Sequence, residues 1–412
     1  MALAASGVLH QSGPTIMTRF RWTLLVAGCV SIATPLAAQA PATPSPYAAF
    51  TQTATVPFVN GARNFAFDLS VAVTVNGHRL TVPVDTGSTG MAVSASVIPG
   101  YDPNSEAAKQ FPVGWEFLSS SKRLWVGRWV PVTVQFLDTA GAPVAEAKVP
   151  VLAVSQAGIC TSYVEASSGP NCPGQTLPPA PSTIGYMGVG FGREQDGQSQ
   201  GTPNHNALLN ITQVGGQPVD AARFRLGYVV SSAGIGIGLT AANTAGFRGV
   251  QLQLRVAPPN TVQDKRDWQQ APVCIGINTL PCQMGAFLGD SGVASMYIDS
   301  TQSLANYTEQ QKDANNQNLS VPVLKPGNSV TIQFGPQAAP VAWYRFTVGQ
   351  QDQPMAPPQV IALSPRSANF VNSGRHVFRG FEVMFDAIGG VYGLKWTGQV
   401  PAAQGGMGAA PR

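Results

Sequence analysis

Two short motifs in this sequence place an aspartate directly before a hydroxyl residue and a glycine. The first contains Asp85 and the second Asp290, and each follows an apolar run typical of a buried strand. If the two loops face each other, their carboxyl groups lie about 3 Å apart and share one proton. The ionised group can then take a proton from a water held between them, while the protonated group donates to a peptide carbonyl oxygen. We therefore predict Asp85 and Asp290 as a catalytic pair that uses no metal and no organic cofactor.

The neighbours of the two aspartates are predicted to support them. Glycine lacks a side chain, so the backbone of each loop can approach closely and its amides can bind carboxylate oxygens. The hydroxyls of Thr86 and Ser291 are expected to form hydrogen bonds between the loops. A single motif of this kind is equally typical of a hydrogen-bonded turn, and it is the second copy that favours catalysis. The predicted supporting residues are Thr86, Gly87, Ser88, Ser291 and Gly292.

Composition places these motifs in an all-β protein. The 412 residues include 44 glycines and 34 prolines, which makes turns frequent and long helices rare. Charged residues are 11% of the chain and the formal net charge is +4, without a run of Lys or Arg, so no nucleic-acid partner is predicted. Short apolar or alternating segments predict the strands. They cover residues 65–75, 79–84, 129–136, 147–154, 224–230, 249–256, 329–334 and 342–348.

Helices are predicted at two places, residues 204–212, where Asn206 can cap the first turn, and residues 303–315. The motifs also form a faint internal repeat, because a glycine in a strand-like segment follows each of them. This glycine is Gly188 after the first motif and Gly374 after the second. Two halves built on one plan would produce this order.

The N-terminal residues are typical of an export signal. Two arginines follow Met17, residues 22–33 are mostly apolar, and Ala38-Gln39-Ala40 has the small residues of a cleavage site. We therefore predict residues 1–40 as a signal peptide, with Met17 as an alternative start, and an exported protein of the periplasm or the medium. A membrane anchor is the alternative, but the apolar run is shorter than the ~20 residues that a spanning helix needs. No membrane span is predicted in the mature chain.

The cysteines also indicate an exported protein. Cys29 lies inside the predicted signal, which leaves four. Their spacing suggests two local disulfides, Cys160–Cys172 and Cys274–Cys282. Metal binding is the alternative, but the chain has no CxxC pair and no histidine near these cysteines.

The motifs and the segments that follow them resemble the pepsin family of aspartic proteases over residues 48–396. Asp85-Thr-Gly-Ser-Thr-Gly is similar to the family's first active-site loop, and Cys282-Gln-Met-Gly-Ala-Phe-Leu-Gly-Asp-Ser-Gly is similar to the second. Other landmarks resemble the family in the same chain order. They are the glycine-centred strand behind the first loop (184–192), the short helix after it (206–210), the strand toward the second half (223–229) and the closing segment (374–394).

This resemblance implies a bilobal all-β fold with a central cleft between two lobes related by an approximate two-fold axis. It divides the chain into a proline-rich lead (41–47), an N-terminal lobe (48–230), a C-terminal lobe (231–398) and a disordered tail (399–412). It implies an aspartic endopeptidase, expected to be a monomer, that cleaves an extended peptide or protein substrate lying across apolar subsites.

Several residues near the second aspartate depart from the family's pattern. Gly289 stands in place of a bulky apolar residue, and Val293 lacks a hydroxyl that would support the carboxylate. Asn372-Ser373 replaces an apolar pair before Gly374. We therefore expect Asp290 to have one hydrogen bond fewer than the pattern provides.

The lid over the cleft also departs from the pattern. The family's lid tyrosine is absent from the hairpin predicted over residues 115–125, and Ala92 replaces its tryptophan partner. Phe117, Trp125 or Trp129 could form a different lid, with ordinary packing between strands as the alternative.

Three other functions remain as alternatives. The same fold with an inactive pair would give a binding protein of the cell envelope. The segment 289–292 also resembles the nucleophile loop of chymotrypsin-like serine proteases, but His78, His205 and His376 are isolated and none has that family's sequence context. A structural β-sandwich would place the two aspartate loops far apart.

Overall fold

Strands build almost the whole of this chain. The computed structural model describes residues 45–165, 167–193, 198–256, 262–314, 319–363 and 368–411. Within these ranges every helical segment is a 3-10 turn of three to five residues, so the predicted all-β class is confirmed. The predicted signal peptide (1–40) and residues 41–44 of the proline-rich lead lie outside the described residues. In the described part, no helix is long and apolar enough to cross a membrane.

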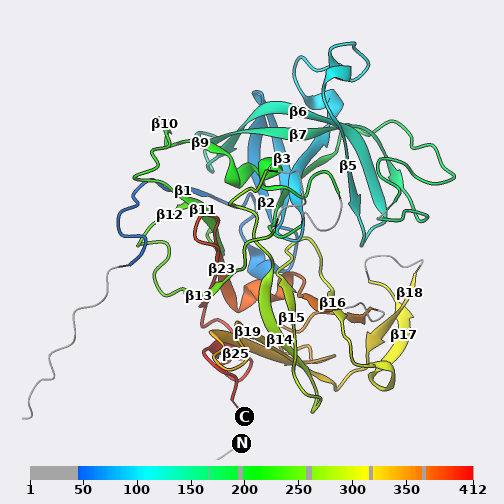
Figure 1. The fold of residues 1–412 in the computed structure, drawn as a ribbon, viewed down its shortest axis with the longest axis vertical. Coiled ribbons are helices and arrows are strands. Elements are labelled where there is room, and N and C mark those ends of the chain that lie inside the picture. The colour runs from blue at the N-terminus through cyan, green and yellow to red at the C-terminus, as the bar shows by residue number, and fades with distance from the viewer. Residues whose placement is uncertain are drawn as a thin grey trace, which may run out of the picture. The chain divides into compact units, whose positions relative to one another are not determined.

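The first sheet, called the N-terminal sheet here, carries Asp85. Within the described residues its nine strands follow the order β10-β9-β7-β4-β8-β3-β2-β6-β5 (Figure 1). The Asn76-Gly77 turn joins β2 to β3 as the sequence predicts. The strands are β2 (Ser70–Val75), β3 (His78–Asp85), β4 (Thr89–Ser94), β5 (Val113–Leu118), β6 (Arg123–Leu137), β7 (Pro143–Ile159), β8 (Gly185–Val189), β9 (Ile211–Val214) and β10 (Gln217–Pro218).

The second sheet, the C-terminal sheet, leads to Asp290. Among the described residues it has ten strands in the order β17-β18-β21-β16-β22-β15-β14-β19-β20-β25. The strands are β14 (Ala271–Ile277), β15 (Gln283–Leu288), β16 (Met296–Asp299), β17 (Thr308–Lys312), β18 (Ser320–Leu324), β19 (Ser329–Phe334), β20 (Ala342–Thr347), β21 (Val360–Ala362), β22 (Asn369–Asn372) and β25 (Gly405–Met407).

A third sheet joins the two halves of the chain. Its order is β1-β12-β11-β23-β24-β13, so β11 (Arg225–Ser231) pairs with β23 (Phe381–Asp386) at its centre. The predicted boundary between residues 230 and 231 therefore falls inside this sheet. From Ser45 onward the chain is one compact unit. The remaining strands are β1 (Ala54–Val56), β12 (Gly234–Leu239), β13 (Arg248–Gln251) and β24 (Val391–Trp396).

The N-terminal and C-terminal sheets share one pattern of strand pairing around their aspartates. In the first, β3 pairs parallel with β8, β8 antiparallel with β4, and β4 parallel with β7. In the second, β15 pairs parallel with β22, β22 antiparallel with β16, and β16 parallel with β21. Gly188 lies opposite Asp85. In the second sheet Asn372 lies opposite Leu288. Asp290 comes two residues after Leu288, and Gly374 comes two residues after Asn372. The internal repeat predicted from the sequence is present as repeated strand pairing.

The helix predicted for residues 204–212 is replaced by two 3-10 turns, η5 (Pro203–His205) and η6 (Ala207–Leu209). Asn206 between them has an extended backbone, which interrupts the helix. The predicted cap is present, because Asn206 Oδ1 accepts a hydrogen bond of 2.9 Å from Leu208 N. Its Nδ2 also donates to the Val189 carbonyl at the end of β8, so this buried residue ties the turns to the sheet.

Three other local predictions are wrong. The described part of residues 303–315 contains η7 (Ala305–Tyr307) and strand β17, because the ladder to β18 provides partners for its backbone. The predicted disordered tail includes β25, which pairs with β20. Gly405 allows this contact, since a Cβ there would lie 2.6 Å from the ring of Trp396. In addition, β13 ends at Gln251, well before the predicted strand end at residue 256.

Both predicted disulfides are present. Cys160–Cys172 closes a loop after β7, with the two Cα atoms 5.7 Å apart. Cys274–Cys282 closes the turn between β14 and β15, with its Cα atoms 5.6 Å apart, and so fastens the hairpin that leads to the second aspartate.

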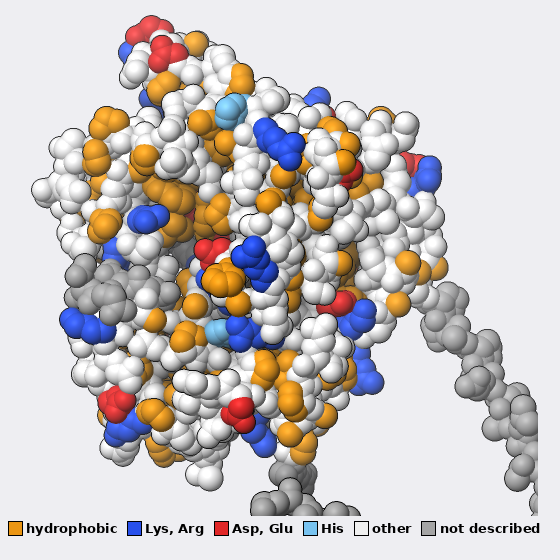
Figure 2. Space-filling model, turned by 180° about the vertical axis from the view of Figure 1, so that it is seen from behind, with side chains coloured by type: hydrophobic (Ala, Val, Ile, Leu, Met, Phe, Trp, Pro, Cys, Tyr) orange, Lys and Arg blue, Asp and Glu red, His pale blue; other side chains and the backbone are white. Residues whose placement is uncertain are grey.

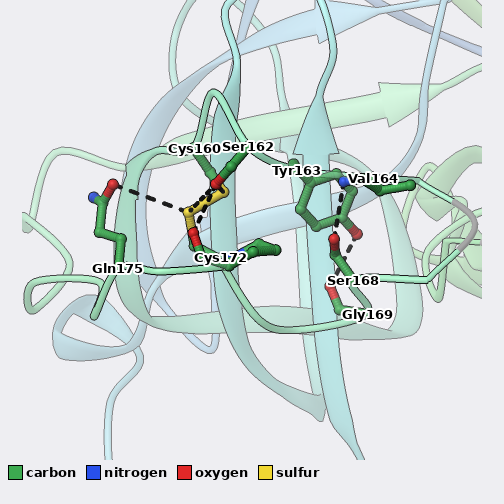
Figure 3. The surroundings of a disulfide bond; sticks show 9 residues. Cys160, Ser162, Tyr163, Val164, Ser168, Gly169, Cys172 and Gln175 are labelled. Carbon is green, nitrogen blue, oxygen red and sulfur yellow. Dashed lines mark hydrogen bonds between the residues drawn. A yellow bond between two sulfur atoms is a disulfide. The ribbon is translucent and has the colours of Figure 1, made fainter.

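The loop closed by the first disulfide is further tied by its own side chains (Figure 3). Ser162 Oγ donates to the Pro173 carbonyl at 2.7 Å, and the Tyr163 hydroxyl donates to the Gly169 carbonyl at 2.9 Å. The ring of Tyr163 stacks on Phe117 of β5 with 4.1 Å between centroids. The loop therefore supports one face of the β5–β6 hairpin.

Replacing both Cys160 and Cys172 by Ser should lower the free energy of unfolding by about 2–4 kcal/mol, because the unfolded chain gains freedom. Amides of β5 should also exchange with solvent faster, since the loop that packs on Phe117 loosens. Denaturant unfolding and hydrogen exchange measure the two effects. The matched control replaces Cys274 and Cys282, which should lower stability without faster exchange in β5. If the β5 amides exchanged equally fast in both variants, the Cys160–Cys172 loop would not be what supports the hairpin.

Candidate active site

The two aspartate loops are in direct contact. Asp85 ends β3, and Asp290 follows β15 by two residues. A Cβ added at Gly87 would overlap the carboxyl carbon of Asp290, and one added at Gly292 would lie 2.7 Å from Asp85 Cγ. Each carboxyl therefore occupies the space that the glycine of the opposite loop leaves free.

Reciprocal hydrogen bonds lock the two loops together. Thr86 N donates to Ser291 Oγ at 3.1 Å, and Ser291 N donates to Thr86 Oγ1 at 3.0 Å. The hydroxyls in turn donate to backbone carbonyls of the opposite loop, Thr86 Oγ1 to Gly289 at 2.6 Å and Ser291 Oγ to Val84 at 2.8 Å. The predicted cross-bonding of the two hydroxyls is confirmed. The alternative of a β-sandwich with distant aspartate loops is therefore wrong.

The Oδ1 atom of each aspartate is held by its own loop. Gly87 N donates to Asp85 Oδ1 at 2.6 Å, and Gly292 N donates to Asp290 Oδ1 at 2.8 Å. These bonds confirm that the predicted supporting glycines offer amides to the carboxyl groups. They fix the plane of each carboxyl relative to its loop.

The Oδ2 atoms have partners that the sequence analysis missed. The Tyr186 hydroxyl donates to Asp85 Oδ2, and Asn372 Nδ2 donates to Asp290 Oδ2 at 2.6 Å. Asn372 thus supplies the hydrogen bond that Val293 cannot give, so the expected deficit at Asp290 is wrong. A signal was present in the sequence, because polar residues stand two positions before both repeated glycines.

Ser88, predicted to support the first aspartate, contacts it through Tyr186. Its Oγ lies 2.9 Å from the Tyr186 hydroxyl, and either atom can be the donor. Burial raises the pKa of Tyr186 well above its ordinary value, and the negative charge of Asp85 raises it further. The phenol therefore stays protonated and remains able to donate.

The carboxyl pair is almost inaccessible to solvent, with Asp85 7% and Asp290 6% exposed. Burial raises the pKa of Asp290 well above its ordinary value, and the charge of Asp85 and a hydrogen bond with it raise it further. The hydrogen bonds from Asn372 and Gly292 lower the pKa of Asp290 and only partly offset these effects. Two buried carboxyls on touching loops can ionise together only at a cost in free energy.

A cavity of about 540 Å³ lies beside Asp85 and is bounded by the β5–β6 hairpin. Its size is in the range of sites that bind small ligands or large side chains. Its wall is apolar and polar in nearly equal parts, with charged groups at Asp68, Asp85 and Arg123. The apolar side chains that line it are Pro83, Val84, Leu118, Trp125, Ala157, Ile159, Pro181 and Ile184.

The aromatic residues considered for a lid have different roles. Trp125 lines the cavity, and its ring meets that of Tyr186 edge-on at 5.4 Å. Phe117 stacks on Tyr163, and Trp129 stacks on His205 at 3.8 Å. Packing between elements therefore accounts for Phe117 and Trp129, and Trp125 alone of the three lines the cavity.

Glu116 is a third carboxyl near the pair, and the sequence analysis missed it. It lies on β5 opposite Trp125 and is 1% exposed. Neither of its carboxyl oxygens has a hydrogen-bond partner among the described residues. Burial raises the pKa of Glu116 well above its ordinary value, and the charge of Asp85 raises it further. The side chain is therefore held neutral inside the hairpin.

The described histidines give no support for a serine-protease site. Ser291 Oγ is engaged with the backbone of the first loop, and no hydrogen bond that the structure describes joins it to a histidine. His205 stacks on Trp129, and burial lowers its pKa to about 4. His376 is buried, and burial together with the nearby charges of Arg379 and Arg375 lowers its pKa to about 3. His78 is exposed.

Other binding sites have little support in the described residues. No group of three or more His, Cys, Asp or Glu side chains among them is arranged to hold a metal ion. On the face that Figure 2 shows, Lys and Arg side chains are scattered among apolar and neutral ones, so that face offers no continuous basic surface for nucleic acid.

No protein-family model matches the chain, and no curated protein is significantly similar to it.

Glu116 gives a stability prediction with a definite sign. Its folded-state pKa is raised, so the folded protein binds the proton more tightly than the unfolded chain and loses stability as pH rises above the ordinary carboxyl pKa. Glu116→Gln should therefore raise the free energy of unfolding at pH 7, by up to about 3 kcal/mol, and change it little at pH 4. Urea unfolding at both pH values measures this. Glu106→Gln, at an exposed site, is the control. If the free energy of unfolding differed between Glu116→Gln and the unmodified chain by the same amount at both pH values, the raised pKa of Glu116 would be contradicted.

Proposed function

We propose that this chain is an aspartic endopeptidase of the pepsin type, with Asp85 and Asp290 as its catalytic pair. The observation that carries the proposal is that two buried carboxyls each lie against the glycine of the opposite loop, while reciprocal hydrogen bonds join the two loops. Two such carboxyls with one shared proton form an acid and a base in the same place. The repeated strand pairing around them supports two lobes built on one plan, as that family has.

The chemistry follows from the shared proton. A water between the carboxyls gives a proton to the ionised one, and its oxygen attacks the peptide carbonyl carbon. The protonated carboxyl donates to the carbonyl oxygen, so the tetrahedral intermediate forms without a free oxyanion. Return of a proton to the leaving nitrogen then breaks the C–N bond. The fixed carboxyl planes help because both proton transfers need short, aligned paths.

The cavity supports a substrate with a bulky apolar side chain next to the cleaved bond. Its wall includes both Asp85 and Trp125, so a side chain held there lies within reach of the pair. An extended, unfolded polypeptide is the substrate class that such a site accepts. We expect a monomer to be sufficient, because both aspartates come from one chain.

Export is part of the same proposal. Two disulfides close short loops, and disulfides persist in oxidising compartments. Together with the signal-like residues 1–40, they support a protein of the periplasm or the medium.

The decisive variants are Asp85→Asn and Asp290→Asn. Each removes the shared proton while keeping an oxygen for the glycine amide, so cleavage should fall by about 10²–10⁴-fold with the fold retained. The assay incubates purified protein with an unfolded polypeptide from pH 3 to 8 and identifies products by mass spectrometry. A statine-type inhibitor should block the unmodified protein.

Asp102→Asn is the matched control, because Asp102 caps an exposed turn in which Asn serves equally well. It should cleave as the unmodified chain does. No cleavage by the unmodified protein over this pH range would contradict the peptidase. Retained binding of the inhibitor or of peptides would then favour an inactive pepsin-fold binding protein.

Ser291→Ala separates this proposal from a serine protease. The variant loses the hydrogen bonds to Val84 and Thr86, which should reduce stability by about 1–2 kcal/mol and leave part of the cleavage activity. A serine enzyme would lose all of it and would be labelled by an organofluorophosphonate. Labelling of the unmodified protein at Ser291 would overturn the aspartic mechanism.

A further inference from the structure

Tyr186 and Asn372 occupy equivalent places in the two halves of the molecule. Tyr186 lies on β8 two residues before Gly188, and Asn372 ends β22 two residues before Gly374. Both strands pair parallel with the strand that carries or leads to an aspartate. Each side chain donates to the Oδ2 atom of that aspartate. The same position in both halves therefore serves the same carboxyl oxygen.

The two donors nevertheless differ in chemistry. Asn372 Oδ1 accepts a hydrogen bond of 2.9 Å from Gly374 N, which fixes the amide with Nδ2 toward Asp290. Asn372 can therefore only donate to Asp290. A tyrosine hydroxyl, in contrast, can either donate or accept.

The hydroxyl of Ser88 completes a reversible chain on the Asp85 side. With Asp85 ionised, Tyr186 donates to Oδ2 and Ser88 can donate to Tyr186. With Asp85 protonated, the same three groups can reverse, so that Asp85 donates to Tyr186 and Tyr186 donates to Ser88. Only the hydroxyl hydrogens rotate, and no net charge moves along the chain. Gly188 leaves room for Ser88, because a Cβ there would lie 2.6 Å from its Oγ.

We propose that Tyr186 and Asn372 are positioning residues for the carboxyl pair, and that Tyr186 with Ser88 keeps Asp85 hydrogen-bonded in both of its protonation states. Asn372 holds Asp290 in one orientation throughout. The inference rests on the proposed function for its catalytic meaning. The hydrogen-bond network itself does not depend on that function.

Tyr186→Phe is the sharpest test, because the ring that contacts Trp125 is kept and only the hydroxyl is lost. The ionised Asp85 then lacks a donor, so kcat/KM should fall by about 10- to 100-fold. The acid limb of its pH profile should move to higher pH. Asn372→Asp keeps an acceptor for Gly374 N but replaces the donor by a like charge, and it should move the limb further.

Tyr344→Phe is the matched control. It removes a fully buried hydroxyl that has no hydrogen-bond partner in the described part of the chain and lies on β20, outside the site. Its pH profile should superimpose on that of the unmodified protein. If the role of Tyr186 is merely structural, the Tyr186→Phe protein should be less stable to heat while the acid limb of its pH profile stays in place. That result would overturn the inference.

A second readout does not need activity. With ¹³C-labelled aspartate carboxyls, NMR follows the titration of the pair, which is assigned from the signals lost in Asp85→Asn and Asp290→Asn. The titration should move to higher pH in Tyr186→Phe and Asn372→Asp and stay in place in Tyr344→Phe. If the unmodified protein cleaves nothing but these shifts occur, only the proposed function fails. If it cleaves and neither profile nor titration moves, only the positioning inference fails.

Discussion

The reciprocal hydrogen bonds between Thr86 and Ser291 are the interaction on which the rest of the site depends. Two buried carboxyls in contact repel each other whenever both ionise, so the loops that carry them need an attraction of their own. Backbone amides and hydroxyls of the two loops provide it through four hydrogen bonds, of which three are buried and one is part-buried. Their geometry leaves no room for side chains at Gly87 and Gly292, where each carboxyl meets the opposite loop.

The sheets explain why this meeting is symmetric. A parallel strand behind each aspartate carries a polar side chain two residues before a glycine, and this side chain donates to the carboxyl. One repeated strand arrangement thus orients both carboxyls. The central pairing of β11 with β23, in the third sheet, joins the two halves.

The sequence was sufficient for features that are local in the chain. The all-β class, both disulfides and the two loops with their hydroxyls and glycines follow from turn residues, spacing and repetition. Tyr186, Asn372 and Glu116 could not be found in this way, because their roles depend on which strands become neighbours. The helix predicted for residues 303–315 failed for the same reason, since pairing of β17 with β18 overrides local preference.

The residues near Asp290 that depart from the family pattern can be understood from the side chains around them. A larger side chain at Gly289 would crowd its neighbours, because a Cβ there would lie 3.1 Å from the Tyr392 hydroxyl and 3.2 Å from Phe287. Val293 offers no hydroxyl, and Asn372 takes over the Oδ2 atom of Asp290. Val293 and Asn372 are therefore linked, because the donor missing at one position is supplied from the other. A decaying site would be expected to lose donors to its buried carboxyls, and both Oδ2 atoms here have one.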